Sequence, residues 1–140
     1  MAEIINQQRK IKIETEVFRT FTENALRQIA VGKTATIAFV SDKNMAELNR
    51  DFRNKNSTTD VLSFPYKADE FEVDDSFLGD IVISLEQAKR QAMENNLTLQ
   101  IEIKQLILHG ILHLLGYDHE TDTGEMNTLE LQFRKKLQIG

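Results

Sequence analysis

Hydrophobic and polar residues along the start of the chain follow the periods of a strand, a helix and a second strand. The alternation KIKI at residues 10–13 predicts a strand, because successive side chains of a strand point to opposite faces. Apolar residues then recur every three or four positions from Val17 to Ile29, which predicts an amphipathic helix. The apolar run TATIAFVS at residues 34–41 predicts a buried strand.

The middle of the chain predicts one helix and two further strands. Ser41 or Asp42 can cap a helix that ends near Arg53, since both side chains accept hydrogen bonds from free backbone N–H groups. The apolar segment DVLSFPY, which contains the only proline, and the segment LGDIVIS at residues 78–84 predict strands. The acidic segment KADEFEVDDS between them predicts a surface loop.

The rest of the sequence predicts three helices. Ser84 begins a capping-box sequence for a helix through about Asn95. Thr98 can cap the next helix, TLQIEIKQLILHGILHLL, which is apolar nearly all round and which Gly116 would end. Helical spacing of apolar residues predicts a last helix from about Gly124 to Gln138. Strands interleaved with helices predict an α/β (α+β) fold, with a mixed sheet of about four strands layered by about five helices.

The composition fits one globular domain over residues 1–140, since a chain of 140 residues suits a single core. The chain has no cysteine, which fits a reducing compartment and means that any metal must be held by His, Asp or Glu. The N-terminal segment lacks the apolar core of a signal peptide, so we expect a cytoplasmic protein without a membrane span. The net charge of −5 disfavours indiscriminate binding to polyanions and still allows a local basic patch.

All three histidines lie in the stretch HGILHLLGYDH. His109 and His113 are four positions apart on a predicted helix, which places both side chains on one face. Gly116 can adopt a positive φ and turn the chain so that His119 approaches this pair. Three imidazoles leave one open position on a tetrahedral Zn²⁺, as in catalytic sites, so the stretch predicts a zinc site. Nickel, copper and iron also accept imidazole ligands, and buried histidines without a metal are the simpler alternative.

The spacing H-x-x-x-H-x-x-G-x-x-H is that of the metzincin peptidases, but one residue differs. Those enzymes carry a glutamate directly after the first histidine as general base. This chain carries Gly110 at that position, and a glycine cannot accept a proton from water. Peptidase activity is therefore disfavoured, whereas hydrolysis of another kind of ester stays open.

Two further residues are candidates for roles beside the histidines. Asp118 can hydrogen-bond a ligand imidazole as an outer partner of the metal, or it can simply stabilise the turn. Arg53 lies where a predicted helix meets a loop, and its guanidinium could clamp a phosphodiester and stabilise the charge of the transition state. A solvated surface arginine is the alternative. The basic cluster Arg134–Lys136 is interpreted as a helix end, where cations suit the dipole, rather than as an RNA-binding patch.

HGILHLLGYDH is similar, at every fixed position, to the H-G-x-L-H-L-x-G-Y-D-H signature of the YbeY-type endoribonucleases, the ribosomal RNA maturation factors of bacteria. Other blocks resemble that family in the same order and spacing: Leu48, Asn49 and Arg53, TDVLSFP at residues 59–65 and LGDI at residues 78–81. Together the blocks cover about residues 48–119, half of the chain.

The resemblance implies a single-domain α/β fold with a metzincin-like metal-binding helix. It also implies a metal, usually zinc, on His109, His113 and His119, and an arginine, here Arg53, that lines the same cleft. The implied activity is cleavage of single-stranded RNA, with roles in 3′-end maturation of 16S rRNA of the small ribosomal subunit and in ribosome quality control in the cytoplasm. A non-catalytic ribosome assembly factor with a structural zinc is the alternative, and a metallopeptidase is a more distant one.

Overall fold

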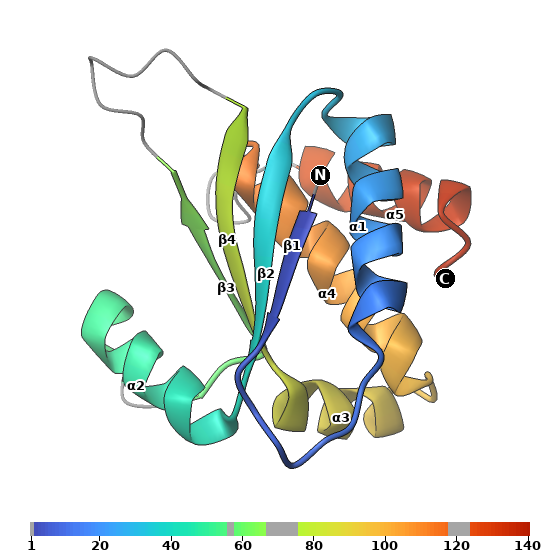
Figure 1. The fold of residues 1–140 in the computed structure, drawn as a ribbon. Helices are drawn as coiled ribbons and strands as arrows, with labels where there is room; N and C mark the ends of the chain where they lie inside the picture. The colour runs from blue at the N-terminus through green and yellow to red at the C-terminus, as the bar shows by residue number, and fades with distance from the viewer. Residues whose placement is uncertain (1, 56–57, 67–75, 118–123) are drawn as a thin grey trace, which may run out of the picture.

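The computed structural model describes residues 2–55, 58–66, 76–117 and 124–140. These residues form four strands and five helices (Figure 1). In chain order the elements are β1 Ala2–Asn6, α1 Thr15–Ile29, β2 Thr34–Val40, α2 Asp42–Arg53, β3 Val61–Pro65, β4 Phe77–Ser84, α3 Leu85–Glu94, α4 Leu99–Leu114 and α5 Glu125–Lys136.

The strands form one mixed sheet in the order β1-β2-β4-β3. β1, β2 and β4 run parallel to one another, while β3 pairs antiparallel with β4 and lies at the edge. The predicted α/β (α+β) class, with a mixed four-stranded sheet and five helices, is confirmed.

The first strand lies elsewhere than the sequence pattern predicts. Residues 10–13, the KIKI alternation, form no strand, and β1 instead consists of the five residues before Gln7. The Gln8 side chain explains the difference, because it accepts a hydrogen bond from Ile11 N at 2.9 Å and donates one to Ile11 O at 2.8 Å. These bonds satisfy the backbone groups of Ile11 within a loop, so this segment needs no sheet partner.

Neighbouring residues of β4 divide the core between the two faces of the sheet. Ile81 and Ile83 are fully buried in the main core with residues of α1 and α4, whereas Val82 packs with Met45 of α2 on the other face. Figure 1 shows α1, α4 and α5 on one side of the sheet and α2 apart from them. α4 contacts β3, β4, α1, α3 and α5, so it is the central helix of the fold.

Helix caps that the sequence predicts fix where three helices begin. The hydroxyl groups of Ser41, Ser84 and Thr98 each accept a hydrogen bond from the backbone N–H three residues later, at 3.2, 3.3 and 3.1 Å. α2, α3 and α4 therefore start at the residues that follow these caps. Of the helices within the described ranges, none has the length and apolar character that crossing a membrane requires.

Candidate active site

α4 ends at a glycine cap, as its sequence predicts. Gly116 has a φ of 102° and donates its N–H to His113 O at 3.0 Å, while Tyr117 N donates to Leu112 O at 3.1 Å. This pair of bonds is a Schellman motif, which turns the chain away from the helix axis one turn after the second histidine. Asp118 and His119, the candidate outer partner and third metal ligand, lie outside the described residues.

His109 and His113 present their Nε2 atoms to the same point. The two Nε2 atoms lie 3.0 Å apart, and the ring centroids lie 4.5 Å apart. Two nitrogens bound to one tetrahedral zinc at 2.0–2.1 Å lie roughly 3.3 Å from each other, so this pair fits a shared metal with little movement. Within residues 2–55, 58–66, 76–117 and 124–140, no group of three or more His, Cys, Asp or Glu side chains could hold a metal.

Glu130 of α5 contacts the Nδ1 side of the His109 ring. Its Oε1 forms a short hydrogen bond with Nδ1 of His109, and only 9% of the Glu130 side chain is exposed. Because a carboxylate only accepts, a neutral His109 that donates from Nδ1 has its lone pair on Nε2, the atom that faces His113. A carboxylate that fixes the tautomer in this way is a common outer partner of metal-binding histidines. The donor set of the described residues thus fits a divalent transition metal.

Sequence reasoning missed Glu130 and singled out Asp118 as the outer partner. One signal was present: Glu130 lies directly after Leu129 and four residues after Met126, on the apolar face of the predicted last helix. A charged residue on such a face needs a partner when it is buried. The identity of that partner could not be read from the sequence, because His109 is 21 positions away.

The histidine pair opens into a cavity of about 770 Å³. Arg53, at the last position of α2, lines this cavity together with His109 and His113. Asn54 ends α2 in the left-handed conformation, with a φ of 55°, and donates its N–H to Arg50 O at 3.1 Å. The helix therefore stops directly after Arg53 and leaves this side chain exposed.

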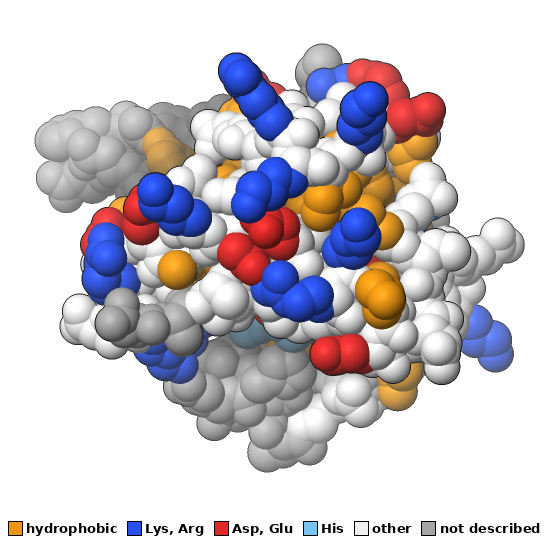
Figure 2. Space-filling view, turned by 90° about the horizontal axis from the view of Figure 1, so that it is seen from below, with side chains coloured by type: hydrophobic (Ala, Val, Ile, Leu, Met, Phe, Trp, Pro, Cys, Tyr) orange, Lys and Arg blue, Asp and Glu red, His pale blue; other side chains and the backbone are white. Residues whose placement is uncertain are grey.

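Exposed aromatic side chains surround the same cavity. Phe52 is 66% exposed and Tyr117 is 37% exposed, and both line the cavity beside the histidines. Phe52 meets Phe64 of β3 edge to face, with ring centroids 5.3 Å apart, which leaves much of its ring surface open. Figure 2 shows part of the histidine surface on the same face as many Lys and Arg side chains.

Gly110 faces the sheet rather than the cavity. A Cβ atom built on Gly110 would lie 2.7 Å from Ile81 Cγ2 and 2.9 Å from both Ile81 Cγ1 and Cδ1. Ile81 is fully buried in β4, so the contact leaves no room for a side chain. The position that carries the glutamate of a metzincin peptidase is therefore used here to pack α4 closely against β4.

The comparison with protein families agrees with the resemblance seen in the sequence. The family described as Endoribonuclease YbeY matches residues 3–138 of this chain. The chain belongs to the YbeY family. Proteins named Endoribonuclease YbeY include one from Nautilia profundicola, which is 45% identical over 116 residues, 83% of this chain and 81% of that protein. Another, from Acholeplasma laidlawii, is 41% identical over 128 residues, 91% of this chain and 90% of that protein.

The fold is also similar to a solved structure. The solution structure of a protein from Thermotoga maritima matches with a TM-score of 0.67 and 26% sequence identity, covering 98% of this chain and 89% of that one. The YbeY-family fold of this chain thus brings His109, His113 and Arg53 to one cavity. Arg134 lies in the last turn of α5, so its interpretation as part of a helix end is confirmed. It also lines the wall of a second cavity with His109 and lies 3.6 Å from Glu130.

Proposed function

We propose that this protein is a zinc-dependent endoribonuclease that cleaves single-stranded RNA. We further propose that it acts in the cytoplasm on the small ribosomal subunit, in 3′-end maturation of 16S rRNA and in ribosome quality control. Endoribonuclease activity follows from membership in the YbeY family. The observation that carries the metal-dependent chemistry is the meeting of two imidazoles and one arginine in a single cavity.

Arg53 is the residue suited to hold the scissile phosphate. A guanidinium presents a rigid fork of N–H donors that matches two phosphate oxygens, and its charge stays fixed at any physiological pH. Because Arg53 lines the cavity of the histidine pair, it can stabilise negative charge that develops on the phosphate during cleavage. The Glu130 carboxylate acts through His109, whose ring it orients toward His113.

The metal would be held by His109 and His113, with His119 as the third ligand. Such an ion supplies a Lewis acid that polarises a phosphoryl oxygen and lowers the pKa of water to about 7. Gly110, packed against Ile81, contributes no proton acceptor, which favours phosphodiester over peptide chemistry.

The aromatic side chains support a preference for single strands. The ring faces of a nucleobase are free for stacking on a protein only when the base is outside a helix. Phe52 and Tyr117 offer exposed rings within the cavity that contains the histidines. A strand whose phosphate lies at Arg53 can therefore place neighbouring bases against these rings.

Cleavage of a labelled single-stranded RNA by the zinc-loaded protein tests the proposal. We expect cleavage of the single strand, little cleavage of the same sequence in a duplex, loss of activity after chelation and recovery when zinc is restored. His113→Ala should lose both zinc and cleavage. Arg53→Ala should keep zinc and lose about 100-fold or more in rate, as is typical when a transition-state charge stabiliser is removed.

Arg27→Ala provides the matched control, because Arg27 is an exposed arginine in the last turn of another helix, α1. This variant should cleave like the wild type. Absence of cleavage by every zinc-loaded preparation, with zinc bound and the fold intact, would instead indicate a non-catalytic assembly factor. Undiminished cleavage by Arg53→Ala would remove Arg53 from the mechanism.

A further inference from the structure

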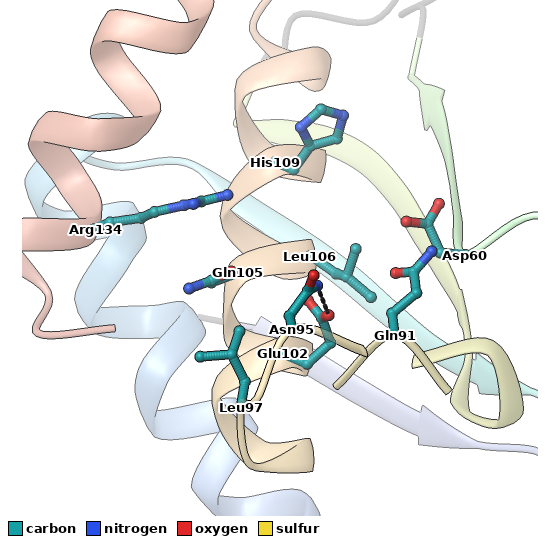
Figure 3. Close-up of a pocket in the computed structure, with 9 residues that line it drawn as sticks. All are labelled: Asp60, Gln91, Asn95, Leu97, Glu102, Gln105, Leu106, His109 and Arg134. Atoms are coloured by element: carbon teal, nitrogen blue, oxygen red, sulfur yellow. Dashed lines mark hydrogen bonds between the residues drawn. The ribbon is translucent and has the colours of Figure 1, made fainter. Parts of the chain in front are cut away.

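A second cavity, of about 480 Å³, adjoins the first one at His109 and Asp60, which line both. It lies between the end of α3, one side of α4 and Arg134 of α5 (Figure 3). Its volume is within the range of about 300–1,000 Å³ that is typical of small-ligand pockets. Nothing in the proposed chemistry of the histidine pair accounts for it.

Both cavities lie along one stripe of α4. Glu102, Leu106, His109 and His113 follow one another at intervals of four, three and four residues, which places them on one helix face. From Glu102 to His113 this stripe is roughly 17 Å long, given a rise of 1.5 Å per residue. An RNA strand that lies along α4 with a phosphate at the histidine pair therefore reaches the second cavity with the adjoining part of the chain.

The charges of the second cavity disfavour a phosphate. Glu102, which is 4% exposed, and Asp60 both line the wall, so two carboxylates border the space. The cation of the wall, Arg134, already has Glu130 at 3.6 Å. The carboxylates would repel a phosphate in this cavity, whereas a neutral ligand could donate its N–H groups to them.

The hydrogen-bonding groups of the wall suit the edge of a nucleobase. Asn95 Nδ2 donates to Glu102 Oε1 at 2.9 Å, which holds the buried carboxylate in place, and Figure 3 shows this pair beside the side chain of Gln91. Leu97 and Leu106 supply apolar surface for the faces of a ring. Flexible single strands present such edges to protein pockets when their bases are unstacked.

We propose that this cavity binds one unpaired base of the RNA close to the scissile phosphate, with guanine preferred. The proposal rests on the endoribonuclease function proposed above. Guanine presents a ring N–H and an exocyclic amine side by side, and both can donate to a carboxylate such as that of Glu102, which only accepts. Adenine and cytosine each present one amine next to an acceptor, and uracil presents one N–H between two carbonyl groups.

Mapping the cleavage sites in a pool of single-stranded RNAs of random sequence tests the assignment. The zinc-loaded wild type should enrich guanosine at one fixed position relative to the cut, by about 5- to 100-fold over uridine, the discrimination expected of a two-bond base contact. Glu102→Gln keeps one side-chain oxygen that can accept the hydrogen bond from Asn95. It replaces the other oxygen, which would accept from the base, by an N–H donor. Its enrichment should fall close to one.

Glu94→Gln is the matched control, because Glu94 is an exposed acid at the end of α3 that does not line the cavity, and its neutralisation changes the net charge equally. It should keep the preference. If Glu102→Gln unfolds, Gln91→Met serves instead, since it keeps the shape of a wall residue and removes its amide, and the preference should weaken. Cleavage without base preference in the wild type, or an unchanged preference in the folded cavity variants, overturns this proposal alone. Absence of any cleavage by the wild type overturns the function on which it rests.

Discussion

Glu130 offers a direct way to weaken the proposed metal site without removing a ligand. Its carboxylate contacts Nδ1 of His109, and its side chain is 9% exposed, so water cannot easily replace it. Substitution of an outer partner of this kind typically lowers metal affinity by about 10- to 100-fold. Glu130→Gln keeps an acceptor but loses the charge, so we expect the lower end of that range. Glu130→Ala leaves the His109 Nδ1–H without this partner, so we expect the upper end.

The same loss should be visible in thermal unfolding. A tenfold loss of affinity corresponds to about 1.4 kcal/mol less stabilisation by a given concentration of zinc. For a domain of this size, about 1 kcal/mol shifts the midpoint of unfolding by roughly 2–4 °C. The increase in midpoint caused by zinc should therefore be roughly 3 to 11 °C smaller in the two variants than in the wild type. Comparing each variant with and without zinc separates this effect from any change in the metal-free fold.

Zinc affinity is measured by competition with a chelating dye, and the midpoint by calorimetry on the same samples. Glu47→Gln is the control, because Glu47 is an exposed acid on α2 and its neutralisation changes the net charge by the same amount. Zinc binding by Glu130→Ala within about threefold of the wild type would refute the reasoning, since the lower bound for an outer partner is about tenfold.

Three further predictions concern other parts of the structure. Gly110→Ala should lower the free energy of unfolding by up to about 2 kcal/mol in chemical denaturation, since overpacking costs about 1–3 kcal/mol and the gain in helix propensity offsets about 1. The same loss in an Ile81→Ala background would show that Gly110 and Ile81 are not in contact, because the effects of substitutions at contacting residues are not additive. Burial raises the pKa of Asp42, but hydrogen bonds led by that of Ser84, and the charge of a nearby guanidinium, outweigh it and hold the pKa below 3.8. The ionised Asp42 carboxylate therefore stabilises the fold above pH 3.8, and this stabilisation is lost as the pH falls through the lower folded-state pKa. In Asp42→Asn the free energy of unfolding should fall less steeply with decreasing pH in the acid range. Phe52→Ala should weaken binding of single-stranded RNA by about 5-fold or more, and Phe52→Trp should bind like the wild type, because bases stack on the ring. Equal affinities of the wild type, Phe52→Ala and Phe52→Trp in fluorescence anisotropy would exclude stacking at this ring.

Local signals predicted much of the fold. The caps at Ser41, Ser84 and Thr98 act within three residues, and the structure places α2, α3 and α4 after them. The positive φ at Gly116 is equally local, and it was expected from a glycine that follows an apolar helix. The strand predicted at KIKI was wrong, because an alternation of four residues is too short to outweigh other local interactions. Here these interactions are the hydrogen bonds between Gln8 and Ile11.

Contacts within one helix of the site could be predicted from the sequence, whereas contacts between helices could not. The spacing of His109 and His113 requires that they share a helix face, and their Nε2 atoms do meet. The contacts from Glu130 and the position of Arg53 in the same cavity depend on how α5 and α2 pack, which no periodicity within one element encodes. The second cavity could not be predicted for the same reason, because its wall comes from α3, α4, α5, the residues between α3 and α4, and Asp60 before β3.

The central claim is that three imidazoles bind one metal ion. X-ray absorption at the zinc edge, on zinc-loaded wild type and His119→Ala, tests it most directly. The account predicts three imidazole nitrogens at about 2.0–2.1 Å and one further light ligand in the wild type, and two imidazoles in the variant. Zinc without imidazole ligands, or an unchanged set of three in His119→Ala, would contradict it.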